Sequence, residues 1–307
     1  MGVPYTWEGE HRSLHSRIDT DARVLDRVAK QYQDDFDKAI KEVYNIWGQG
    51  GKLVSENMVK PISLKQKAML QKRMQRWIDS GIYAQDKQFI RKLERMITKP
   101  IIRRQEFLEI NIRRVTSEIK IEQSPLLLKS LYQTWLDSER TVARIMSTSF
   151  QRAGDDFIYK KIAEKFQGTS LISRMFNQAS MMTDQFMRAS SLALAQGVSY
   201  KGMKQVIKYF FSKGDYRARR ILVTESARIN TEAKFEAYKK NDVKLYQYVS
   251  VMDDRTTDIC VWHDLKVYKV SKMVVGKNAP PMHVNCRSTT KAYFIDDRSG
   301  QGGNYPP

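Results

Sequence analysis

Three short stretches near the end of the chain decide the fold class: LYQYVSVM (residues 245–252), KVYKV (266–270) and STTKAYF (288–294). They alternate apolar and polar side chains and are rich in Tyr, Val and Thr, which is typical of β-strands. Before residue 241, apolar side chains instead recur every three or four positions, the period of an amphipathic helix. The sequence therefore predicts an α+β protein, with a mostly helical N-terminal body followed by a small β-containing C-terminal module.

The helical body divides at glycines, prolines and capping residues. Residues 12–47 carry the longest apolar stripe, and Gly48 follows it. Ser63 is suited to an N-cap and Gly81 to a stop. The helices expected after the first one cover 63–79, 84–97, 101–121, a segment opened by Ser124-Pro125, 170–196, 199–211 and 217–241.

This pattern predicts three regions along the chain. Residues 1–165 form a helical N-terminal region. Residues 166–298 join helices over 170–241 to a β module over 244–295. Residues 299–307 are rich in Gly and Pro, and a flexible tail is expected there.

Composition limits the classes of protein to which the chain can belong. Its 307 residues include 53 Lys and Arg against 34 Asp and Glu, a formal net charge of +19, and two Cys. No stretch approaches the roughly 18 apolar residues of a membrane span, and no apolar run near residue 1 suggests a secretion signal. Two Cys exclude a disulfide scaffold. The charge predicts an acidic partner such as nucleic acid.

The positive charge is concentrated in two segments. Residues 61–120 carry 15 basic and 6 acidic side chains, and residues 201–240 carry 11 and 4, whereas residues 1–60 are nearly neutral. One interpretation is a solvated helix face, and the other is a surface that follows nucleic-acid phosphates. Under the second, the DNA-contacting side chains are Lys72, Arg73, Arg76, Arg103, Arg104, Arg113, Arg114, Arg217, Arg219 and Arg220.

Both cysteines and two of the four histidines lie within 27 residues, in CVWH (Cys260, His263) and HVNC (His283, Cys286). Thiolate and imidazole are ligands that zinc prefers, and four of them complete a structural site. The pattern therefore predicts a structural zinc site. The alternatives are a metal-free buried cluster, because Cys often packs as a small apolar residue, and a disulfide between the two cysteines.

A polar loop precedes Cys260 and contains Asp253, Asp254, Arg255, Thr256 and Asp258. Hydrolytic chemistry would need a general base placed beside these carboxylates, and the sequence offers no obvious Glu or His for that task. We therefore expect the loop to form local hydrogen bonds between side chains and backbone.

These motifs resemble the phage minor head protein family, the Mu F-like head morphogenesis proteins. The resemblance rests on Asp254-Arg255-Thr256, Cys260 and the run Pro281, His283, Asn285, Cys286 and Arg287. The preceding helix is similar as well, through Thr224, Glu225, Arg228 and Asn230, and Gly197-Val198-Ser199 looks like the turn before that helix. The likeness covers about residues 190–295.

The resemblance implies a non-enzymatic minor capsid protein of the virion. Such a protein is assembled in the host cytoplasm, lies in the capsid interior, and has the portal protein and the major capsid or scaffolding protein as partners. It would contact double-stranded DNA through phosphates and aid head assembly and DNA ejection, without a membrane partner. Residues 166–298 would be the Mu F-like module, and residues 1–165 would dock on the portal or capsid.

The chain departs from the family pattern at Thr257 and Ser288, where the family often has Cys. If zinc binds, His263 or Asp254 must then supply the fourth ligand. Two competing functions remain open from the sequence. One is a metal-dependent nuclease of His-Asn-His type, suggested by Pro281-x-His283-x-Asn285 and by the pair His263-Asp264. The other is a non-specific DNA-binding accessory protein.

Overall fold

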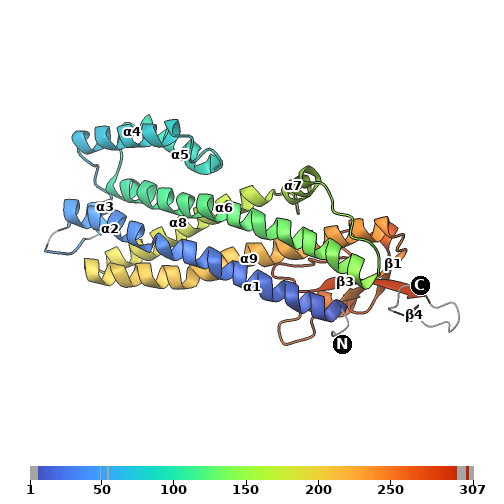
Figure 1. Ribbon diagram of the computed structural model, residues 1–307. Coiled ribbons are helices and arrows are strands. Elements are labelled where there is room, and N and C mark those ends of the chain that lie inside the picture. Colours follow the sequence, from blue (N-terminus) through green and yellow to red (C-terminus); the bar gives the residue numbers. More distant parts are fainter. Residues whose placement is uncertain (1–5, 49, 54, 296–301, 304–307) are drawn as a thin grey trace. The chain divides into compact units, whose positions relative to one another are not determined.

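The computed structural model describes residues 6–48, 50–53, 55–295 and 302–303, without the side chains of 55, 212–217 and 302–303. Within these residues the chain is mostly helical, and its strands are confined to the C-terminal part (Figure 1). This confirms the α+β class. None of the described helices has the length and apolar character needed to cross a membrane.

Chain contacts divide the molecule into two compact units. Unit 1 holds Met1–Arg23, Leu126–Glu164 and Ala218–Pro307, and unit 2 holds Val24–Pro125 and Lys165–Arg217. Each unit therefore draws on segments that are far apart in the sequence, because long helices contribute to both. The sequence-based division instead placed one boundary between residues 165 and 166.

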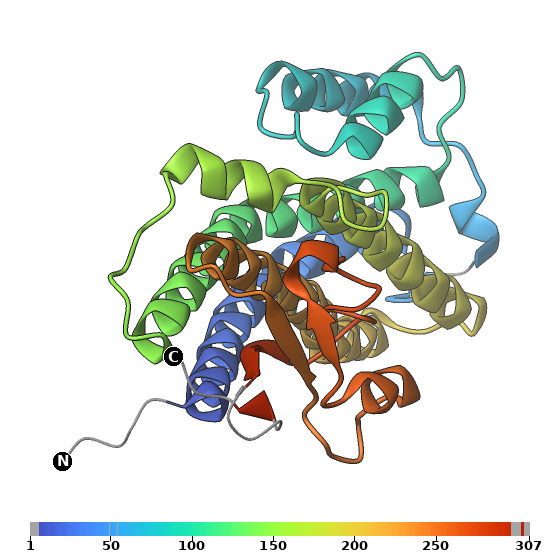
Figure 2. The same cartoon turned by 90° about the vertical axis from the view of Figure 1, so that its right-hand side faces the viewer.

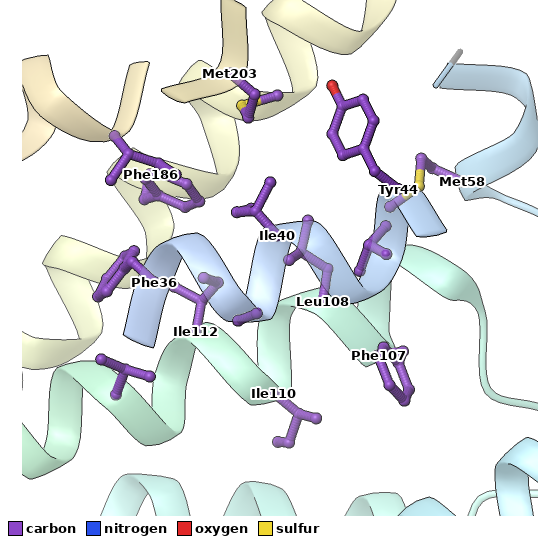
Figure 3. Close-up of a cluster of buried hydrophobic side chains, with 14 of the residues drawn as sticks. Phe36, Ile40, Tyr44, Met58, Phe107, Leu108, Ile110, Ile112, Phe186 and Met203 are labelled. Atoms are coloured by element: carbon purple, nitrogen blue, oxygen red, sulfur yellow. The ribbon is translucent and has the colours of Figure 1, made fainter. Parts of the chain in front are cut away.

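Unit 2 is built from helices alone. The described helices that it contains or shares are α1 (Trp7–Gln31), α2 (Gln33–Trp47), α3 (Ser55–Met58), α4 (Leu64–Asp79), α5 (Lys87–Ile97), α6 (Arg104–Ile145), α8 (Leu171–Ala195) and α9 (Tyr200–Lys240). Its core is an apolar cluster in which Phe36 and Ile40 of α2 pack near Ile112 of α6 and Phe186 of α8 (Figure 3). Rings within this cluster meet edge to face, as between Phe36 and Phe186 with centroids 5.2 Å apart.

Unit 1 packs a small sheet against helices. Besides parts of α1, α6 and α9 it contains α7 (Asp155–Ala163), α10 (Asp258–His263) and the strands β1 (Leu245–Val249), β2 (Val267–Lys269), β3 (Thr289–Ile295) and β4 (Gly302–Gly303). The strand order is β2-β1-β3-β4, and all neighbours are antiparallel. Figure 2 shows the strands beside α9. Tyr246 of β1 and Ala292 of β3 join Tyr238 of α9 in one buried cluster.

Several expected helix boundaries are correct. Ser63 caps α4 through its side chain and forms a capping box with Gln66, and α8 begins after Ser170, close to the expected residue 170. The strands β1 and β2 lie inside the first two stretches that alternate in sequence, and β3 coincides with the third except that it ends one residue later, at Ile295. In the expected tail, residues 302–303 form β4, and the other residues of 299–307 lie outside the described part of the chain.

Three expected helix boundaries are wrong. The stripe over 12–47 is divided at Tyr32, where α1 ends and the acidic first turn of α2 begins. The helix start expected at Ser124-Pro125 is absent. Helix α6 runs through Pro125, and Ser124 Oγ donates a hydrogen bond to the Lys120 carbonyl. The segments 199–211 and 217–241 belong to one helix, α9. Charged and glycine residues between them suggested a loop, but the helix continues.

Candidate metal centre and the contacts of the terminal module

The candidate metal centre lies in unit 1, in residues 244–295, which we call the terminal module. Cys260 comes from α10, whereas His283 and Cys286 come from the turn that precedes β3. Asn285 in this turn has φ +60°, a left-handed conformation that Asn tolerates better than most residues. This backbone geometry brings His283 and Cys286 to the same side as Cys260.

The sequence motif is brought together in space. Cys260 Sγ lies 3.2 Å from His283 Nε2 and 3.8 Å from Cys286 Sγ, and the three ligand atoms all lie within 4.8 Å of one another. Two sulfurs bound tetrahedrally at roughly 2.3 Å from one zinc ion would be about 3.8 Å apart. The two sulfurs therefore already have the separation that such an ion requires, and His283 Nε2 lies close to both of them.

The imidazole of His283 is oriented by the backbone carbonyl of the next residue. Its Nδ1 lies 2.8 Å from the carbonyl oxygen of Val284, so Nδ1 carries the proton and donates. The lone pair is then on Nε2, which faces Cys260 Sγ. A metal-binding histidine usually donates its other ring nitrogen to a carbonyl or carboxylate in this way, because that bond fixes the tautomer.

The two thiols differ in acidity. The hydrogen bond between them lowers the pKa of Cys286 to about 6 and raises that of Cys260 to about 12. Burial also raises the pKa of Cys260, and both side chains are almost fully buried. The pair therefore holds one proton at neutral pH, with the negative charge on Cys286, and a thiolate is the form of cysteine that binds metals.

Neither residue expected to supply a fourth ligand joins the cluster. His263 is buried, and its Nδ1 lies 2.7 Å from the hydroxyl of Tyr268. Asp254 is exposed and belongs to no group of metal-ligating side chains found in the described residues. Tyr248 was not anticipated from the sequence, yet its hydroxyl lies 3.4 Å from Cys260 Sγ.

The polar loop before Cys260 holds the turn that carries Cys286. Both carboxylate oxygens of Asp253 accept hydrogen bonds from Arg287, at 2.7 and 2.5 Å. Arg287 holds the pKa of Asp253 well below its usual range. Thr256 Oγ1 accepts from the Asp253 backbone at 2.9 Å, and Arg255 is exposed. The acidic residue that matters structurally is thus Asp253, and the spacing D-x-R-T over 253–256 was the sequence signal for it.

The motif residues of α9 link this helix to the module and to α7. Thr224 Oγ1 accepts from the backbone N–H of Asn285 at 3.0 Å. Arg228 is 1% exposed, pairs with Glu225 and Glu232, and donates to the carbonyls of Lys161 and Ile162. These side chains therefore fasten unit 1 together.

Asn230 bridges two elements of unit 1. Its side-chain amide donates to Thr289 Oγ1 of β3 at 3.2 Å, and its carbonyl oxygen accepts from Ser138 Oγ of α6 at 2.8 Å. Pro281, also part of the motif, follows Pro280 through a cis peptide bond and is buried.

The ten side chains assigned to DNA contact fall into different environments. Lys72, Arg76, Arg103 and Arg220 are exposed. Arg219 is exposed but pairs with Asp19, and the partly buried Arg73, Arg104 and Arg114 lie against Glu42, Trp47 and Glu118 respectively. The side chain of Arg217 lies outside the described residues.

Arg113 has to be removed from the set of DNA-contacting side chains. Its side chain is 4% exposed and pairs with the fully buried carboxylate of Asp86. Arg113 lies in a basic helical segment of the sequence. No sequence pattern indicates that Asp86, from the loop before α5, is its buried partner. A buried guanidinium that already has its counter-charge cannot reach a phosphate.

The fold is α+β, and the turn that carries Cys286 of the Cys–His–Cys cluster is hydrogen-bonded to the long helix α9. A sequence model of the family described as Phage Mu protein F like protein matches residues 184–291, a segment that contains both the cluster and the α9 motif. Over this segment the chain is similar to the Mu F-like family, and the resemblance seen in the sequence is confirmed. No curated protein and no solved structure matches the chain. This match indicates a phage head morphogenesis protein and hence a virion component.

Proposed function

We propose that this protein is a minor capsid protein that associates with the portal inside the procapsid, contacts packaged double-stranded DNA, and aids head assembly and DNA ejection. The observation that carries the proposal is the match of residues 184–291 to the Mu F-like family. The same family is one of structural proteins, which is compatible with a role that requires no catalysis.

DNA contact is assigned to exposed cations of unit 2. Lys72, Arg76 and Arg103 are exposed, and the segment 61–120 to which they belong has a large excess of positive charge. Such side chains bind phosphates without reading bases, and each phosphate contact releases counterions. Affinity for duplex DNA should therefore fall steeply with salt, with a log–log slope of roughly −0.9 per contacted phosphate.

The test compares two triple variants of equal charge change. Replacing Lys72, Arg76 and Arg103 by Gln should weaken binding to duplexes of any sequence and reduce the salt slope by up to about 3. The control replaces Lys38, Lys41 and Lys52, which are exposed cations of the near-neutral N-terminal segment. Equal losses in the two variants would refute a localised DNA surface.

Portal docking is assigned to the helices within residues 1–165. The most exposed large apolar side chain there is Leu64 at 84%, and Met69 of the same helix α4 is 57% exposed. Apolar side chains exposed in this way are more typical of protein contact than of DNA contact.

The docking test uses surface substitutions in place of a truncation. Deleting residues 1–60 would also remove Trp7, which packs on Tyr238, and His11, which binds the Arg287 carbonyl. Leu64→Glu combined with Met69→Glu should reduce recruitment to procapsids, and Leu192→Glu on α8, 64% exposed, is the control. Unchanged recruitment of the α4 variant would contradict this docking surface.

A structural zinc ion is proposed for Cys260, His283 and Cys286. The ligand spacing, the lone pair of His283 Nε2 and the acidified thiol of Cys286 support this donor set. Zinc would supply folding free energy to this small module. The described residues near the cluster offer three such ligands, so solvent would complete the tetrahedron.

Elemental analysis of the purified chain tests the zinc proposal. We expect close to one zinc per chain and a loss of the metal, with a lower melting temperature, in Cys286→Ser. Ser271→Ala, a small change in the 3-10 turn after β2, is the control. A wild-type chain without zinc that melts unchanged in chelator would leave the cluster as a metal-free buried contact and refute the proposal.

A further inference from the structure

A polar cavity in unit 1 has no role in the function proposed above. It has a volume of about 190 Å³ and is lined by side chains of three helices, among them Glu10 and His11 of α1, Asp137 and Thr141 of α6, and Lys234 of α9. One water molecule needs only roughly 10–15 Å³ of such space. The cavity is therefore large enough for a small polyatomic ligand and could hold more than one water molecule.

The most buried cation that lines this cavity is Lys234, and the carboxylate of Glu10 offsets the cost of its burial only in part. Lys234 is 3% exposed, and its ammonium donates to Thr289 Oγ1 at 2.8 Å and to the Thr290 carbonyl at 3.0 Å. Its closest aromatic neighbour is Trp7, with Nζ 5.1 Å from the ring centroid. Lys234 forms no ion pair within the described part of the chain. Burial of an unpaired ammonium is costly, and it lowers the pKa of Lys234 to about 7.

Three arginines also line the cavity, and one of them, Arg17, pairs with Asp21. Arg17 and Arg140 both pair with Asp137, and Arg144 pairs with Glu10. Arg140 and Arg144 have 40% and 49% of their side chains exposed, so they reach from the cavity towards solvent. With Lys234 protonated, the four cations of the lining face the carboxylates of Glu10, Asp137 and Asp21, so the site keeps a net positive charge that favours an anion.

One lining atom needs a hydrogen-bond donor. His11 Nε2 lies 2.7 Å from the carbonyl oxygen of Arg287, so Nε2 carries the proton and donates. Burial lowers the pKa of His11 to about 3, and the ring is neutral. Its other nitrogen, Nδ1, is therefore an acceptor, and it is buried without a partner among the described residues. A buried unpaired acceptor of this kind indicates a ligand or water that donates to it.

We propose that this cavity is a binding site for inorganic phosphate in its hydrogen phosphate form. The ion has three oxygens that accept from Lys234 and the arginines, and one P–O–H group that donates to His11 Nδ1. A water molecule would satisfy Nδ1 but leave the positive charge uncompensated. Sulfate has the same shape and charge but no hydrogen to donate, and a phosphate monoester dianion likewise has none. The site should therefore prefer hydrogen phosphate to both.

Isothermal titration of the full chain at pH 7.5 tests this assignment with inorganic phosphate, sulfate and a nucleoside 5′-monophosphate as probes. We expect phosphate to bind roughly tenfold more tightly than either competitor, because each competitor leaves the buried Nδ1 without a donor. Equal affinity for phosphate and sulfate, or no binding of phosphate, would overturn the proposal. Tighter binding of the monophosphate would also overturn it, since the ligand would then be an esterified phosphate.

Variants locate the site and separate it from DNA binding. Lys234→Met should weaken phosphate binding at least about tenfold, whereas Lys239→Met, an exposed lysine on the same helix, should leave it unchanged. If Lys234→Met fails to fold, Arg140→Gln at the partly exposed side of the cavity replaces it, and this variant should also weaken phosphate binding at least about tenfold. The Lys72, Arg76 and Arg103 variant should retain phosphate binding. Unchanged affinity in the cavity variant would refute the assigned site.

Discussion

Among the described residues, more polar side chains are buried in unit 1 than in unit 2. Unit 2 is held by an apolar cluster whose members include Phe36, Ile40 and Phe186, and its buried ion pair is Asp86 with Arg113. Unit 1 buries Arg228, Lys234 and Asn230 together with the Cys–His–Cys cluster. Apolar cores tolerate changes that preserve volume, whereas a buried polar network depends on every partner. Unit 1 should therefore be far less tolerant of substitution than unit 2.

The largest effect is expected for Arg228→Met in unit 1. The substitution leaves Glu225 and the carbonyls of Lys161 and Ile162 without this donor in a buried site. Loss of one member of a buried ion pair typically costs about 3–5 kcal/mol. Denaturant unfolding should show this loss, and Arg220→Met, at an exposed position of the same helix, should change stability by less than about 0.5 kcal/mol. Similar small effects at both positions would remove the contrast between the units.

A pH effect of intermediate size is expected at Lys234. The folded pKa of about 7 lies below the ordinary lysine value of 10.5, so between these values the unfolded chain binds more protons. The cost of burying Lys234 is fully present below pH 7 and falls as pH rises towards 10.5. The stability of the wild type relative to that of Lys234→Met should therefore rise by about 2 kcal/mol between pH 7 and pH 9. A pH-independent difference would show that Lys234 stays protonated in the folded state over this range, so that its pKa is not lowered.

The smallest effect is expected in the apolar core of unit 2. Ile40→Val removes one methylene from a side chain that is 1% exposed. Such a change typically costs about 1 kcal/mol, because neighbours relax partly into the space. Denaturant unfolding should give this value without a change in m. A cost as large as that of Arg228→Met would show that unit 2 is packed as restrictively as unit 1.

The same difference between units explains how much could be predicted from the sequence. Apolar periodicity is local, so it placed α4, α8 and the three strands, and cysteine and histidine spacing anticipated the contact of Cys260 with His283 and Cys286. Polar partners from distant segments leave no such pattern. The pairing of Arg113 with Asp86, and the contact of His11 with the Arg287 carbonyl, join residues 27 and 276 positions apart.

Helix continuity was the other limit of prediction. Pro125 and the segment 212–217 have the composition of helix ends, yet α6 and α9 continue through them. Tertiary packing of long apolar faces outweighs a local cost of roughly 1 kcal/mol for Gly or 3 kcal/mol for Pro. Prediction of the site was limited as well. The spacing of His263 from Cys260 suggested a metal ligand, but its ring is hydrogen-bonded to the hydroxyl of Tyr268.

The most direct test of the central claim is quantitative mass spectrometry of purified phage heads, assembled with the wild-type chain and with a variant of its Mu F-like segment. We predict that the wild-type chain is present in mature heads, and that Thr224→Val, which removes the acceptor for the Asn285 N–H, reduces its amount relative to the major capsid protein. Heads that assemble normally and contain none of the wild-type chain would contradict the assignment to head morphogenesis.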